Sequence, residues 1–107
     1  MTEEPDLRGR LDAVDRLLEH RVRLAIAVLL TRYDRLSFPR LKTLTGETDG
    51  SLGAHTRRLE QAGYVRVKKE FVDRKPVTWY ALTDEGREAL DDHLTALEGL
   101  IGDADPR

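Results

Sequence analysis

The chain has 107 residues, no cysteine and a formal net charge of −2 at pH 7. Its length fits one domain, residues 1–107, near the size at which a second copy of a chain often supplies extra burial. The lack of cysteine excludes disulfides, thiolate zinc sites and cysteine nucleophiles, and no apolar run approaches the roughly 20 residues of a membrane helix. We therefore expect a cytoplasmic protein with no membrane partner.

Charge is distributed unevenly along the chain. Residues 1–36 hold seven basic and seven acidic residues, residues 37–80 hold nine and five, and residues 81–107 hold two and eight. A basic middle with an acidic tail can turn a positive surface toward phosphate while the far side stays soluble. The alternative is a solvated surface whose uneven charge faces no partner.

Two helices are predicted in the first third of the chain. Apolar residues recur three or four positions apart at Leu7, Leu11, Val14 and Leu18, the stripe of an amphipathic helix over about residues 7–19. Residues 24–30 are apolar almost all round, which is typical of a helix buried at the centre of a core. The first helix has one apolar face and must pack against another element.

A pair of short helices follows an extended step at residues 36–38. Pro39 fits the first turn of the earlier helix, and Gly46 is well placed to end it. Thr48 is a good N-cap for the later helix, whose inner side we expect to hold Leu52, Thr56, Leu59 and Ala62. Gly63 then ends this later helix in a left-handed conformation.

A hairpin and a last helix complete the predicted elements. Apolar and polar residues alternate over residues 65–71 and 77–81, which predicts two strands joined by a turn at residues 73–76. The last helix begins after Thr83, a natural N-cap, and covers about residues 84–101. Its narrow apolar seam is typical of a helix that packs on a partner helix. The seam residues are Leu90, Leu94, Leu97 and Ile101.

The order of these elements, a helix-turn-helix followed by a hairpin, resembles the winged helix-turn-helix transcription regulators of bacteria and archaea, of the MarR-like and ArsR-like kind. The resemblance covers about residues 11–100. Its motifs are LEHRVRLAI (residues 18–26), SFPRL (37–41), RLEQAGYV (58–65) and LTDEGR (82–87). The expected fold is mainly α with a small β-hairpin wing and a core at about residues 11–82.

The resemblance implies a sequence-specific regulator of transcription, a repressor acting as a homodimer on duplex DNA. Each copy lays residues 48–62 in a major groove, and its hairpin reaches the minor groove or backbone nearby. The two-fold axis predicts a pseudo-palindromic operator with half-sites about 34 Å apart, or a multiple of that distance. The dimer surface we expect comprises Leu7, Leu11, Val14, Leu18, Leu90, Leu94, Leu97 and Ile101. Alternatively, the two terminal helices pack on each other within one chain.

Candidate DNA contacts lie in the later of the two short helices and in the hairpin. Arg57 and Arg58 are expected to meet phosphates, with guanine reading open to one of them. Arg74 and Lys75 resemble the basic wing tip of the family, although Asp73 weakens the local field. The remaining candidates are Thr48, Ser51, Gly53, Ala54, His55, which would donate to phosphate, and Lys68. Lys68 and Lys69 could instead be charges that protect a strand edge.

The start of this helix is poor in side chains that read bases. Glycine within a helix costs about 1 kcal/mol relative to alanine, so Gly50 and Gly53 indicate either close approach of the backbone to DNA or a binder that reads shape. Arg23, in the preceding core helix, matches a recurrent family arginine that touches phosphate or braces the fold.

Other function classes have little support. His93 follows two carboxylates in the last helix, but without cysteine these residues form a poor metal site, and we expect no metal or cofactor. No nucleophile has a fixed base beside it, so we expect no enzyme. Two alternatives stay open: a winged-helix module that binds protein, and a sensor with an unknown small-molecule effector near Trp79, Tyr80 and Leu94.

Overall fold

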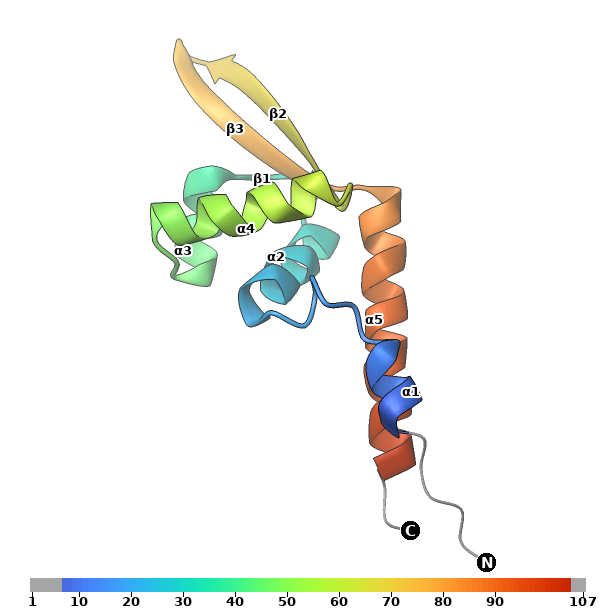
Figure 1. Ribbon diagram of the computed structural model, residues 1–107. Helices are drawn as coiled ribbons and strands as arrows, with labels where there is room; N and C mark the ends of the chain where they lie inside the picture. The colour runs from blue at the N-terminus through green and yellow to red at the C-terminus, as the bar shows by residue number, and fades with distance from the viewer. Residues whose placement is uncertain (1–6, 105–107) are drawn as a thin grey trace, which may run out of the picture.

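The computed structural model describes residues 7–104, and it has the element order that the sequence predicts (Figure 1). The elements are, in chain order, α1 (Leu7–Asp12), α2 (Arg21–Arg32), β1 (Leu36–Ser37), α3 (Phe38–Thr45), α4 (Asp49–Gln61), β2 (Val65–Val72), β3 (Lys75–Leu82) and α5 (Asp84–Ala104). The fold is a winged helix with a three-stranded antiparallel sheet, which confirms the predicted class. The predicted domain also includes residues 1–6 and 105–107, which lie outside the described residues.

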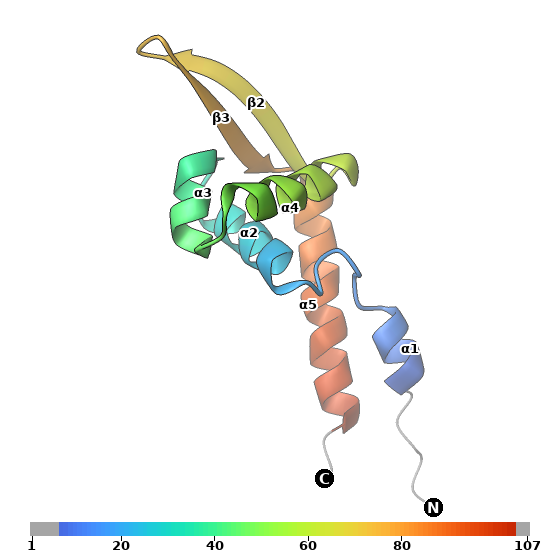
Figure 2. The same ribbon diagram turned by 60° about the vertical axis from the view of Figure 1, so that its left-hand side comes forward.

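The molecule has two regions, which Figures 1 and 2 show from two sides. The head consists of α2, α3, α4 and the sheet. The stalk consists of α1 and residues 94–104 of α5, and it points away from the head on the side opposite the hairpin tip. Because α5 belongs to the head at its first turns and to the stalk at its last, it joins the two regions.

Helix α2 is the centre of the core, as its apolar sequence predicts. Val22, Ile26 and Leu30 follow one another on successive turns and are buried. A histidine begins the helix, since the side chain of His20 accepts a hydrogen bond from the backbone N–H of Val22. The buried residues packed around α2 are Leu18, Leu36, Leu41, Leu52, Leu59, Val65, Tyr80 and Leu90. Every element of the head therefore places at least one apolar side chain in a common core.

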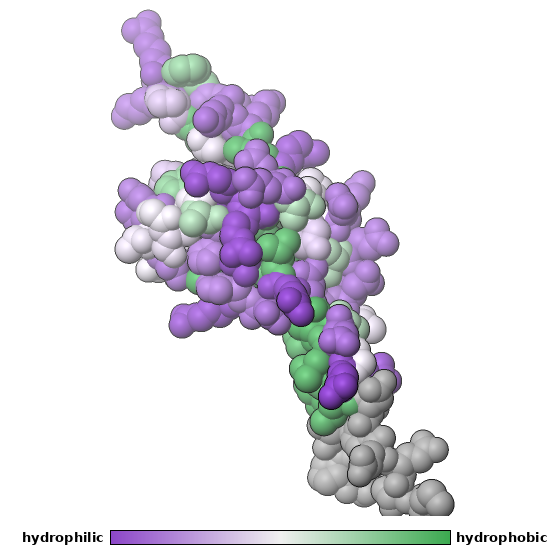
Figure 3. Space-filling model, viewed as in Figure 1, coloured by the Kyte–Doolittle hydropathy of each residue, from purple (hydrophilic) through white to green (hydrophobic). Residues whose placement is uncertain are grey.

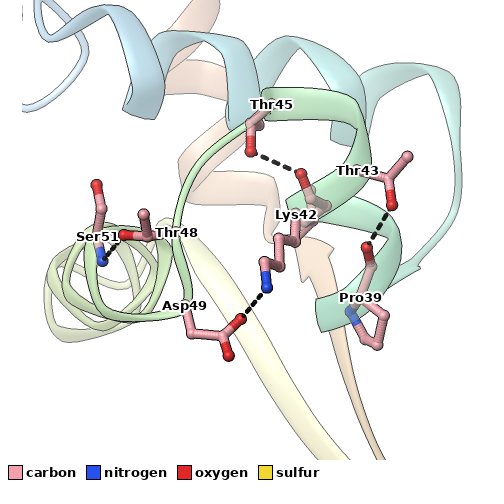
Figure 4. Close-up of polar contacts among 8 residues, drawn as sticks. Pro39, Lys42, Thr43, Thr45, Thr48, Asp49 and Ser51 are labelled. Carbon is pink, nitrogen blue, oxygen red and sulfur yellow. Dashed lines mark hydrogen bonds and ion pairs between the residues drawn. The ribbon is translucent and has the colours of Figure 1, made fainter.

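The turn between α3 and α4 is held by local hydrogen bonds (Figure 4). Gly46 adopts a left-handed conformation with φ 71° at the end of α3, and Thr48 accepts a hydrogen bond from the N–H of Ser51 at the start of α4. Lys42 of α3 also pairs with Asp49 of α4 at 2.9 Å. Both caps confirm the predicted helix boundaries, and together these contacts set the angle at which α4 leaves the turn.

The hairpin is longer and its turn tighter than predicted. Only Asp73 and Arg74 form the turn, with φ values of 52° and 67°, and Lys75 already belongs to β3. Two central residues with positive φ are the mark of a type I′ turn, whose twist matches that of the strands. Pro76 is tolerated in β3 because β1 pairs only with Trp79 and Tyr80, so the missing N–H faces no partner strand.

The first helix is shorter than predicted. Helix α1 ends at Asp12 instead of continuing to about residue 19. The carboxylate of Asp15 accepts hydrogen bonds from the N–H groups of Leu17 and Leu18 at 2.8 and 3.2 Å, and this local pattern competes with the helix. The same carboxylate accepts a bond from the hydroxyl of Tyr64 at 2.6 Å. Tertiary contacts to Asp15 therefore replace the last two turns of the predicted helix.

The break in the first helix moves Leu18 into the core of the head. Leu18 is completely buried, and Leu90 of α5 is buried beside the same cluster. Both residues were predicted to lie at a dimer surface, and the prediction is wrong because neither side chain reaches the exterior of one chain. Helix α1 does pack along α5, so the intramolecular alternative holds for these two helices.

The junction between the head and α5 depends on one close approach of two backbones. Thr83 caps α5 by accepting a hydrogen bond from the N–H of Gly86, as predicted, and its hydroxyl donates to the carbonyl of Gly63. A side chain at Gly86 would collide with the carbonyl oxygen of Tyr64. Glycine at this position thus lets the first turn of α5 lie directly against the chain that leaves α4.

Candidate nucleic-acid interface

Helix α4 has one buried face and one face open to solvent. Leu52, Thr56 and Leu59 point into the core, with Thr56 also donating a hydrogen bond to the carbonyl of Gly53. The open face carries the exposed residues Gly50, Ala54, Arg57, Arg58 and Gln61. At Gly50 and Gly53 an added Cβ would meet no protein atom within 4 Å. Packing inside the chain therefore does not require glycine at either position.

A polar groove separates α4 from the hairpin. It has a volume of about 290 Å³, and its walls are Gly53, Thr56, Arg57 and Glu60 from α4 and Val67, Lys69, Thr78 and Tyr80 from the sheet. Arg57 and Lys69 place a positive charge on each wall. A phosphodiester backbone running along this groove would meet both cations.

The strand register decides which hairpin lysine faces α4. Lys69 pairs with Thr78 and shares its face with Val67, which lies against the head. Lys68 pairs with Trp79 on the opposite face, where its ammonium forms a 3.0 Å ion pair with Glu70. The sequence analysis assigned Lys68 to DNA; the geometry makes Lys69 the residue that faces the groove. Strand alternation alone contained this signal, because Lys69 has the same parity as Val65 and Val67.

The N-terminal turn of α4 uses its polar side chains internally. Thr48 caps the helix, and the hydroxyl of Ser51 donates to the carboxylate of Glu47 at 2.9 Å. Asp49 is held by Lys42. Of the predicted readers in this turn, Ser51 reaches a base only if it leaves Glu47, while Gly53 and Ala54 present backbone and a methyl group.

His55 points toward α2 instead of the open face of α4. Its ring lies 4.4 Å from the ring of His20, and its Nδ1 lies 3.1 Å from a guanidinium nitrogen of Arg23. Because arginine only donates, this Nδ1 accepts the bond. Burial lowers the pKa of His55, and the nearby His20 and Arg23 lower it further. The neutral ring therefore braces α4 against α2, which corrects the prediction that it donates to phosphate.

Arg23 has the bracing role of the two that its family position implies. It is buried, and its Nε donates to the carbonyl oxygen of Leu17 at 2.7 Å while its other end bonds His55. It thus ties together the segment before α2, α2 itself and α4.

The hairpin tip is a mixed cationic and apolar surface. Arg74 and Lys75 are exposed there, as predicted for a wing tip, and Asp73 adds one negative charge. Farther down the outer face, the guanidinium of Arg35 lies 4.0 Å from the centre of the Trp79 ring, a cation–π contact.

The effector pocket expected near Trp79, Tyr80 and Leu94 is not assembled from those residues. Trp79 and Tyr80 line a cavity of about 210 Å³ on the outer face of the sheet, together with Asp34, Arg35, Arg66, Lys68 and Ala81. Leu94 lies in the stalk, away from this cavity, and is exposed. The Nε1 of Trp79 is buried and has no hydrogen-bond partner among the described residues.

His93 has a structural role in α5. It is buried, and its Nδ1 accepts a hydrogen bond from the N–H of Asp15 at 3.1 Å. Within residues 7–104, no three histidine or acidic side chains gather as a metal site would require. No helix in the same range is long and apolar enough to cross a bilayer.

The stalk leaves apolar side chains uncovered. Leu11, Leu94 and Ile101 are 57%, 40% and 70% exposed, and Leu7 is also exposed. Val14 and Leu97 are half-buried. Figure 3 shows this hydrophobic surface gathered over the stalk, in contrast to the polar surface of the head. Six of the eight predicted dimer residues thus remain accessible in one chain.

Known proteins with this architecture bind DNA. A family model described as a winged helix DNA-binding domain matches residues 22–101. An uncharacterized protein of Methanocaldococcus jannaschii is 33% identical over 73 residues, which are 68% of this chain and 79% of the relative. The structure of a transcriptional regulator homologue from Pyrococcus horikoshii is 30% identical, with a TM-score of 0.81 over 92% of this chain and 96% of that one.

A third similar structure is a complex with DNA. It is Sco3205, a MarR family transcriptional regulator from Streptomyces coelicolor, which is 27% identical with a TM-score of 0.64. The match covers 92% of this chain and 71% of that one. The chain described here therefore belongs to the winged helix DNA-binding domain family and is a transcriptional regulator of the MarR type.

Proposed function

We propose that this regulator acts as a homodimer that binds a pseudo-palindromic operator and represses transcription by occupying it, a binding function without catalysis, in the cytoplasm. The observation that carries the DNA contact is the groove in which Arg57 of α4 faces Lys69 of the hairpin. The open face of α4 enters the major groove, the phosphate backbone follows the groove between helix and hairpin, and Arg74 approaches the minor groove.

The homodimer is supported by the uncovered apolar surface of the stalk. Leu11, Leu94 and Ile101 are exposed on a chain whose head already has a complete core. Contiguous exposed apolar surface on a soluble protein commonly marks an interaction site. A second stalk supplies the matching surface, and the two-fold axis then directs the two copies of α4 toward the same side of the duplex.

The operator is tested by selection from a random duplex library. We expect enrichment of an inverted repeat whose halves are about one helical turn apart, or a multiple of it. Enrichment of a single half-site would refute the dimeric arrangement. Binding that is insensitive to salt would instead favour a module that binds protein.

The groove is tested by removing one of its charges. Arg57→Gln should reduce the dependence of log affinity on log salt by about 0.9, the value for one phosphate. Arg8→Gln in the stalk removes the same charge far from the groove and should leave this slope unchanged (Figure 1). Equal slopes for wild type and Arg57→Gln would remove the groove from the interface.

A small-molecule effector is a second candidate, supported by the cavity beside Trp79. Arg35, Arg66 and Lys68 give this cavity three cations, and the unpartnered Nε1 of Trp79 is a free donor. Such a lining suits a small aromatic carboxylate. Titration of salicylate or benzoate should quench Trp79 fluorescence if the site binds this class, and an unchanged spectrum would count against it.

A further inference from the structure

Phe71 is an aromatic side chain with no place in the core. It is 80% exposed, more than any other large apolar side chain among residues 7–104 whose exposure is described. It lies in β2 two residues before the turn, directly opposite Pro76 of β3. Because it packs against none of the buried cluster, the stability of the fold gives no reason for an aromatic ring at this position.

The strand register shows which way this ring points. Side chains two apart on a strand share a face, so Phe71 continues the row that begins with Val67 and Lys69. Val67 and Lys69 line the groove that faces α4. Phe71 and Pro76 thus extend the proposed DNA surface outward, from the groove to the tip of the hairpin.

The charges around Phe71 favour a polyanion over an apolar protein partner. Lys69 lies two residues before it, and Arg74 and Lys75 follow in the turn and the next strand. The acid of this segment nearest to Phe71, Glu70, points to the other face, where Lys68 and Arg35 lower its pKa by hydrogen bonding and charge. The apolar ring is therefore framed by cations whose charge is not neutralised on its own face.

We propose that Phe71 is a wedge that enters the minor groove beside the operator half-site and partly unstacks one base step. The inference rests on the proposed DNA-binding function and adds a specificity-determining residue to it. Arg74 and Lys75 hold the flanking phosphates, and Pro76 supports the ring from the opposite strand. Apolar side chains inserted in this way kink duplexes toward the major groove.

The wedge reads deformability instead of base edges. Pyrimidine–purine steps such as TA unstack most easily, so they should be preferred where the hairpin meets the duplex. This gives the protein a source of sequence preference that the glycine- and alanine-rich start of α4 lacks.

The experiment uses the full chain and the duplex enriched from the random library, with 2-aminopurine placed at successive steps outside each half-site. Wild type should raise 2-aminopurine fluorescence at one step on each side and prefer TA over GG there by about tenfold. Phe71→Ala should abolish the fluorescence rise and reduce the preference to less than about twofold, while Phe71→Leu should keep part of both. Val72→Ala removes an exposed neighbour on the opposite face and should change neither readout.

Each result decides between the wedge and its alternatives. A wild-type protein that binds the duplex without unstacking any step overturns the wedge and leaves the proposed function intact. The same conclusion follows if Phe71→Ala keeps the fluorescence rise and the TA preference. Failure of the wild type to bind any duplex refutes the proposed function itself. Thermal unfolding of Phe71→Ala should match wild type, because the ring is not part of the core.

Discussion

The head and the stalk differ in how far each satisfies its own side chains. In the head, α3 and α4 are capped, their apolar residues lie in one core, and the surface left over is polar and basic. In the stalk, α1 packs on α5 but leaves Leu11, Leu94 and Ile101 in contact with water. One region is complete within a single chain, and the other has the surface of a half-built interface.

The comparison teaches that the two regions obtain their partners by different physics. Charges on the head are stable in water and gain from long-range attraction to phosphate, which salt weakens. Apolar surface in the stalk is unfavourable in water at about 25 cal/mol for each Å² and is relieved only by burial, which salt hardly affects. The regions should therefore respond to different substitutions and meet at the junction around Tyr64 and Gly86.

The strongest test of this division is a charge in the stalk. Leu94→Glu should convert the dimer into monomers and weaken operator binding by about 1,000-fold, because each half-site is then bound separately. Light scattering at matched concentrations and titration of labelled operator measure the two effects. Thr95→Glu introduces the same charge at an adjacent exposed position and should leave both unchanged. A Leu94→Glu protein that remains dimeric would show that another surface holds the dimer.

The junction is tested next, at the closest contact between α5 and the head. Gly86→Ala should lower the free energy of unfolding by about 3 kcal/mol, since the new methyl group collides with the carbonyl oxygen of Tyr64. Gly50→Ala adds a methyl group where no atom lies within 4 Å and should raise stability by up to about 1 kcal/mol. Denaturant unfolding followed by circular dichroism measures both. Equal effects would mean that the backbones at Gly86 separate easily.

A smaller effect is expected from the hydrogen bond that ties the segment after α1 to the head. Tyr64→Phe removes the donor to the Asp15 carboxylate and should cost about 1.5 kcal/mol of stability. The matched control is Tyr33→Phe, because Tyr33 is exposed at the end of α2. A change in Tyr64→Phe no larger than in Tyr33→Phe would show that water replaces the Tyr64 hydroxyl without cost.

The same hydroxyl predicts an alkaline dependence. Its bond to Asp15, with burial, raises the pKa of Tyr64 from 10.0 to about 12. The folded chain therefore keeps its proton where the unfolded chain loses it. This stabilisation is complete below pH 10 and is lost as pH rises from 10 to about 12. Wild type should lose stability relative to Tyr64→Phe over that interval, and parallel curves would contradict the assignment.

Most of the fold follows from local sequence. Thr48 and Thr83 as N-caps, Gly46 and Gly63 as helix ends, and the apolar run in α2 were all predicted and are confirmed. Each depends on interactions within a few residues, such as a hydroxyl bonding a nearby N–H or a glycine accepting a positive φ. Such signals are the same in a peptide and in a folded chain, so they can be read without the structure.

The tertiary structure decided the rest, because it depends on residues far apart in sequence. Periodicity alone extended the first helix to residue 19, whereas Tyr64 and His93 bind Asp15 and break it. Strand register set Lys69 and Phe71 on the α4 side and Lys68 on the other. Burial separated Leu18 and Leu90 from the exposed stalk residues, and the contact with Arg23 turned His55 inward. The sequence determined which elements form, and long-range packing determined which of their faces remain available to bind.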